Sequence, residues 1–80
     1  MCRSIHVLRD GAEVAADDDI TAAALQYVRK VSGYRRPSVA NEAAFNEAVW
    51  EVAAASRRLL DSVAATHPAA RARARARGVA

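Results

Sequence analysis

The sequence predicts an all-α protein, an antiparallel helical hairpin with a short helix at about 17–32 and a long helix at about 38–66. An N-terminal arm precedes the hairpin and a disordered Arg-Ala tail follows it. Three observations support this fold class. Apolar residues recur every three or four positions in two stretches, 21 of the 80 residues are the strong helix former alanine, and helix stop and start signals separate the stretches.

The length and composition allow one small domain, residues 1–68, with a basic low-complexity segment at 69–80. Because half of the apolar residues are alanine, whose side chain buries little surface, an isolated two-helix hairpin has a marginal core. Either the arm folds over the hairpin or two chains pair. We favour pairing and expect a homodimer formed through the long helix.

The arm, residues 1–16, is the least regular part of the sequence. Ile5, Val7 and Leu8 alternate loosely with polar residues, which fits either a short extended segment or a turn of helix. The pair Asp10-Gly11 that follows is typical of a turn.

The first helix is expected to begin at Asp17, which is a good N-cap residue. Ser32-Gly33 ends it, because glycine suits the left-handed conformation that follows a helix. One face of this helix is apolar. Its members are Ile20, Ala23, Ala24, Tyr27, Val28 and Val31.

The second helix begins after Pro37, with Ser38 or Asn41 as its N-cap, and ends where His67-Pro68 stops it. Its apolar stripe is long. The stripe consists of Phe45, Ala48, Val49, Val52, Ser56, Leu59, Leu60 and Val63. Since the first helix is too short to cover all of it, half of the stripe needs another partner. Trp50 lies roughly 140° from Phe45 around the helix, which favours a second contact surface over ligand stacking or simple exposure.

The net charge of +3 comes from the tail. Its arginines are Arg71, Arg73, Arg75 and Arg77. Residues 1–70 contain 8 basic and 9 acidic residues, so the folded part is close to neutral. The two-residue period does not place these arginines on one helix face, and we expect the tail to be disordered and to bind nucleic acid only weakly and without sequence preference.

The composition excludes several classes of protein. No apolar run is long enough for a signal peptide or a membrane helix, so we expect a cytoplasmic protein with no membrane contact. The candidate bases His6 and His67 stand near opposite ends of the chain, and a Cys2–His6 pair supplies fewer ligands than zinc needs. We expect no enzyme activity, catalytic residue, metal or cofactor.

The turn between the helices is the candidate binding site. Four cations and a tyrosine precede the N-terminus of the second helix, where unpaired backbone N–H groups favour anions. The candidate anion-binding residues are Arg29, Lys30, Tyr34, Arg35, Arg36 and Ser38. The alternative is a well-capped turn, in which Arg29 and Lys30 complement the first helix dipole and the other arginines are solvated or paired with acidic residues.

A family resemblance rests on three features of the sequence. They are the segments AAALQYVRKVSG, RPS and ANEAAF within Ala22–Phe45, the opening Met1-Cys2-Arg3 and the pair Leu59-Leu60. They resemble an uncharacterised bacterial family, the domain-of-unknown-function family 2277. The chain departs from it in two places: Val14-Ala15-Ala16-Asp17 replaces a Pro-Pro-Ala-Thr run, and Trp50 stands where the family has a polar residue. The resemblance implies no activity and no catalytic residue.

We therefore expect a small helical interaction or oligomerisation module. The alternative is a phosphate or nucleic-acid binder that uses Arg29–Ser38 with help from the tail.

Overall fold

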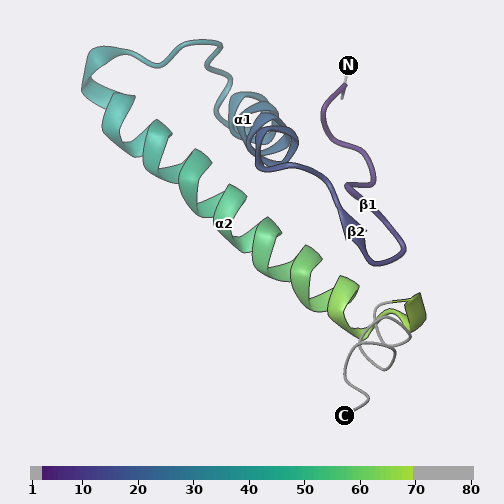
Figure 1. Cartoon of the computed structure of the whole chain (residues 1–80). Coiled ribbons are helices and arrows are strands. Elements are labelled where there is room, and N and C mark those ends of the chain that lie inside the picture. Colours follow the sequence, from purple (N-terminus) through teal and green to yellow (C-terminus); the bar gives the residue numbers. More distant parts are fainter. Residues whose placement is uncertain (1–2, 70–80) are drawn as a thin grey trace.

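The computed structural model describes residues 3–69. Two short strands, β1 (Arg9–Asp10) and β2 (Glu13–Val14), precede helix α1 (Asp17–Ser32), a 3-10 turn η1 (Val39–Asn41) and helix α2 (Glu42–Thr66). Figure 1 shows α2 as the longest element, with α1 beside it and the β-hairpin toward its C-terminal end. The prediction of a mostly helical chain with a short and a long helix is confirmed.

The all-α prediction is wrong for the arm, which forms an antiparallel hairpin. Arg9 pairs with Val14 and Asp10 with Glu13, and the backbone N–H of Ala15 donates to the Leu8 carbonyl at 2.9 Å. Gly11 begins the two-residue turn with φ +61°, a conformation that glycine adopts without steric cost. The predicted Asp10-Gly11 turn is thus confirmed, whereas Ile5, Val7 and Leu8 lie in neither a strand nor a helix.

The predicted bounds of the first helix, 17–32, are confirmed, but its N-cap is not Asp17. Ala16 is the N-cap and makes no side-chain capping bond, whereas Asp17 is the first helical residue. Gly33 ends α1 in the left-handed conformation with φ 80°, and its N–H donates to the Arg29 carbonyl at 2.9 Å. The sequence therefore placed the acidic first turn and the glycine stop correctly and the cap one residue too late.

The second helix begins later than the predicted residue 38. Ser38 is the N-cap of η1, and Asn41 is the N-cap of α2, which starts at Glu42 and ends at Thr66 as expected. Both candidate residues thus occupy N-cap positions, but neither makes a side-chain capping hydrogen bond. The Asn41 side-chain amide donates to the Ser38 hydroxyl at 3.0 Å, which joins the two starts.

The two helices meet over only part of their lengths. Asp17 reaches Arg57, while Thr21, further along α1, shares a hollow with Trp50, so the chains of the two helices run in opposite senses. In Figure 1 α1 is seen nearly along its axis and α2 from the side, which shows that the helices are strongly inclined to each other. Because of this inclination α1 covers the middle of α2 and not its C-terminal end.

The core is small: most of it lies at this crossing, and Ala64 lies further along α2, toward the end that the β-hairpin contacts. Its buried residues are Ile20, Ala24, Val28, Phe45 and Ala64. Of the predicted α1 face, Tyr27 and Val31 are instead 51% and 65% exposed, and Leu59 of the α2 stripe is 63% exposed. The other members of the α2 stripe are buried or half-buried within the single chain.

The arm covers the part of α2 that α1 does not reach. β2 contacts α2, and a Cβ atom placed on Gly11 would lie 3.3 Å from the His67 ring. At the other end of the arm, the Ser4 N–H donates to the Gln26 side-chain carbonyl at 2.9 Å, which fixes the arm across α1. The sequence left two ways to cover the rest of the stripe, a folded-back arm or a second chain. Within the single chain, the folded-back arm covers it.

The packing of the hairpin turn against His67 is testable by comparing the two left-handed glycines. Gly33→Ala should cost about 1 kcal/mol, because nothing lies within 4 Å of the added Cβ and only the strained φ contributes. Gly11→Ala should cost more, since the Cβ also displaces the His67 ring. Urea unfolding should show that this additional cost of Gly11→Ala disappears in a His67→Ala background. Equal losses of unfolding free energy at both glycines would contradict the contact with His67.

Candidate functional site

The predicted anion site lies where α1 ends and α2 begins, and the structure divides it into two groups. Arg29 and Lys30, in the last turn of α1, line a shallow hollow together with Ser4 of the arm. Tyr34 and Ser38 belong to the other group, because both bond to Asn41: its amide lies 3.3 Å from the Tyr34 hydroxyl and 3.0 Å from the Ser38 hydroxyl.

Arg35 and Arg36 stand between these groups on the exposed loop. Within residues 3–69, neither they nor Arg29 and Lys30 form an ion pair. Glu42 occupies the first turn of α2, where its carboxylate complements the helix dipole that would otherwise favour a bound anion. The predicted site thus offers accessible cations around an internally bonded turn.

A second site, not predicted as such, lies between α1 and α2 beside Trp50. Trp50 borders a hollow of about 270 Å³ between α1 and α2. The remaining lining residues are Asp17, Ile20, Thr21, Ala53, Ala54 and Arg57. The Trp50 side chain is 71% exposed, so the largest aromatic ring of the chain stands beside the core without joining it.

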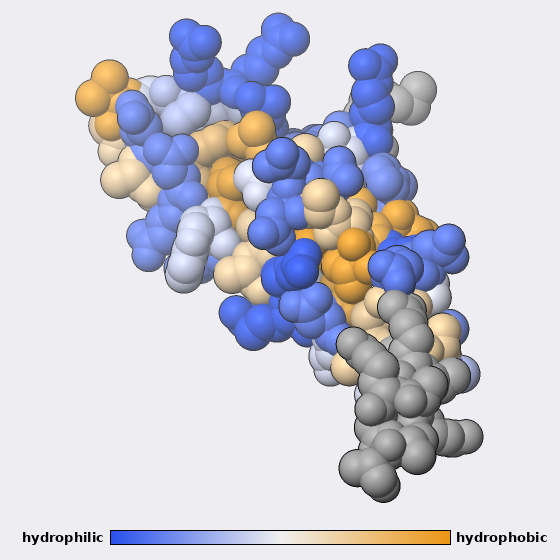
Figure 2. Space-filling model, in the orientation of Figure 1, coloured by the Kyte–Doolittle hydropathy of each residue, from blue (hydrophilic) through white to orange (hydrophobic). Residues whose placement is uncertain are grey.

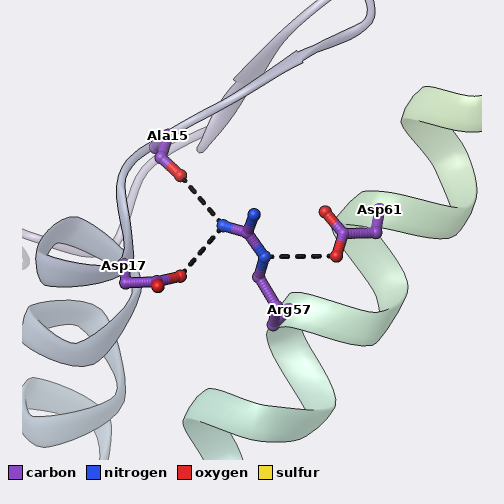
Figure 3. A network of polar contacts seen from close by, with 4 residues as sticks. All are labelled: Ala15, Asp17, Arg57 and Asp61. Carbon is purple, nitrogen blue, oxygen red and sulfur yellow. Dashed lines mark hydrogen bonds and ion pairs between the residues drawn. The ribbon is translucent and has the colours of Figure 1, made fainter.

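Arg57 closes one end of this hollow and holds three segments together. Its Nη1 group lies 3.0 Å from the Asp17 carboxylate and donates to the Ala15 carbonyl at 3.4 Å. Its Nε–H donates to Asp61 at 3.1 Å, one helical turn further along α2. Figure 3 shows the guanidinium between the two helices, reaching the arm–α1 junction on one side and Asp61 on the other. One side chain thus fixes where the arm enters α1.

The sequence alone indicates one of the two ion pairs that Arg57 forms. The Arg57–Asp61 spacing of four residues is typical of a helix-surface ion pair. Nothing local indicates the link to Asp17, which lies 40 positions earlier in the chain.

The outward side of α2 carries a further set of exposed groups. We call it the outer face of α2, and it consists of Glu47, Trp50, Glu51, Ala54 and Arg58. Trp50 and the three charged residues are exposed, and Ala54 is half-buried. Figure 2 shows that hydrophobic side chains reach the visible surface in separate areas bordered by hydrophilic ones. A single exposed tryptophan among charges is consistent with this mixed surface.

The remaining predictions concern metal binding, membrane contact, Cys2 and the tail. Within the described residues, no group of histidine, cysteine, aspartate and glutamate side chains is arranged to hold a metal ion. Neither described helix has the length and apolar character needed to cross a membrane. Cys2 and the tail arginines Arg71, Arg73, Arg75 and Arg77 lie outside the described residues.

Comparison with known proteins gives one match. A family model described as "Uncharacterized conserved protein (DUF2277)" matches residues 1–77. No curated protein matches the chain, and no solved structure matches it.

The role of Arg57 in holding the arm predicts an order of stability losses. Arg57→Ala should cost about 1–2 kcal/mol, since it removes two exposed ion pairs and the bond to the Ala15 carbonyl. Asp61→Ala should cost only about 0.3–0.5 kcal/mol, because it removes the pair within α2 alone. Chemical denaturation measures both. Equal losses for the two variants would show that Arg57 does not hold the arm–α1 junction.

Proposed function

The chain belongs to the uncharacterised family DUF2277, and we propose that it acts as a helical interaction module that binds a protein partner through the outer face of α2. The observation that carries this proposal is the 71% exposure of Trp50. Tryptophan and arginine are the side chains that most often dominate the binding energy of protein interfaces.

The chain gains little folding stability from Trp50 at this position. Most of the ring faces solvent, and the indole N–H donates no hydrogen bond within residues 3–69. Phe45, by comparison, is 8% exposed and fills the core. A partner that covered the indole would remove a large apolar area from water, whereas the folded chain alone leaves that area exposed.

The surroundings of Trp50 fit a small docking surface. Ala53 and Ala54 beside the ring leave the backbone of α2 open to close approach, and the neighbouring hollow is also lined by Ile20. Exposed charges border this apolar centre on the outer face. An apolar anchor surrounded by polar groups is the usual arrangement of a protein interface.

Site-specific photo-crosslinking in cells of the natural host tests this proposal. A benzophenone amino acid at the exposed position 46, one turn before Trp50, should give a discrete product of higher mass. The same group at the exposed position 59, nine residues after Trp50 and therefore on the opposite side of α2, should not. The product should disappear when Trp50→Ser is combined with the probe at 46. Identical products from both positions, or none, would contradict a docking surface around Trp50.

We propose anion binding at the basic turn as a second candidate, supported by the exposure of Arg35 and Arg36 and by their lack of ion pairs within the described residues. Exposed arginines of this kind bind phosphate groups in a salt-dependent way. The arginine tail would add further phosphate contacts.

Deletion of residues 69–80 separates the turn from the tail. Binding of a fluorescent DNA duplex by the full chain at low salt should be weak and should fall steeply as salt rises. If the turn is responsible, binding survives the deletion and Arg35→Gln/Arg36→Gln abolishes it. Loss of binding on deletion alone would assign it to the tail, and absence of binding by the full chain would overturn the second candidate.

A further inference from the structure

We infer that the partner of the outer face of α2 is a second copy of this chain, packed with its α2 antiparallel to the first about a two-fold axis near Ala54. This inference rests on the proposed function, since it names the occupant of the same surface. It also gives a specific arrangement to the homodimer expected from the sequence.

The order of charges along α2 supports this occupant. Glu47 and Glu51 precede the centre of the outer face, and Arg58 follows it. None of the three forms an ion pair within residues 3–69, whereas the neighbouring Arg57 and Asp61 are already paired. A parallel copy would place like charges opposite each other. An antiparallel copy places the acidic half of each helix opposite the basic position of the other.

The spacing suits such a two-fold arrangement. Glu51 and Arg58 are seven residues apart, which places them on the same side of the helix at about 10.5 Å along its axis. An axis midway between them brings each Glu51 opposite Arg58 of the partner subunit. Two symmetric ion pairs then form in one isologous interface.

Trp50 and Ala54 supply the apolar part of this interface. Ala54 lies beside the axis, where its small side chain allows the two helices to approach closely. Trp50 lies one turn before Ala54 on the same side of the helix, so α2 of the partner subunit covers part of the indole ring. The contact is small and strongly charged, so we expect a reversible dimer whose population falls as salt is added.

Sedimentation velocity over the micromolar concentration range tests the arrangement. The wild-type chain should show a monomer–dimer equilibrium. Glu51→Arg and Arg58→Glu should each weaken association about tenfold or more, because each reverses two symmetric contacts. The double variant, Glu51→Arg with Arg58→Glu, should regain most of the lost affinity. Arg3→Glu, a reversal at an exposed arginine of the arm that forms no ion pair within residues 3–69, is the matched control and should leave association unchanged.

The outcomes separate this inference from the proposed function. Association without recovery in the double variant would overturn the antiparallel arrangement. A monomeric wild-type chain would overturn self-association altogether. A Trp50-dependent crosslinked product whose mass differs from twice that of the chain would also overturn it and would leave the interaction module standing. Circular dichroism of each variant shows whether the helices remain folded.

Discussion

The difference in length between the two helices is the constraint on which the rest of the structure depends. α1 has 16 residues and α2 has 25, and the inclination of α1 confines their contact to the middle of α2 (Figure 1). An apolar stripe that continued past this contact would lie in water. The arm resolves the problem by turning at Gly11 and packing its hairpin against the C-terminal end of α2.

This solution depends on a few polar contacts because the core is too small to hold the arm by packing alone. Arg57 ties α2 to the junction between the arm and α1, and Gln26 accepts the Ser4 N–H at the far end of the arm. Each contact is partly exposed and contributes modestly. Together they fix both ends of a segment that has little regular structure of its own.

Local signals in the sequence predicted the helices well. Gly33 has the conformation that its position after Ser32 indicates, and the end of α2 at Thr66 follows from His67-Pro68. The hairpin was missed because its strands have two residues each, too few for an alternating pattern to show. The start of α2 was ambiguous because Ser38 and Asn41 are both suitable N-cap residues, and they occupy the N-cap positions of η1 and α2 without a side-chain capping bond.

The contacts that position the candidate sites lie far apart in the sequence and could not be predicted from it. The Arg57–Asp17 pair joins residues 40 positions apart, and no single-sequence pattern distinguishes Asp17 from its acidic neighbours. The stripe that first suggested a dimer is largely covered by α1 and the arm. Trp50 is the aromatic residue that stays accessible to a partner, because the folded arm does not cover it and α1 only borders it.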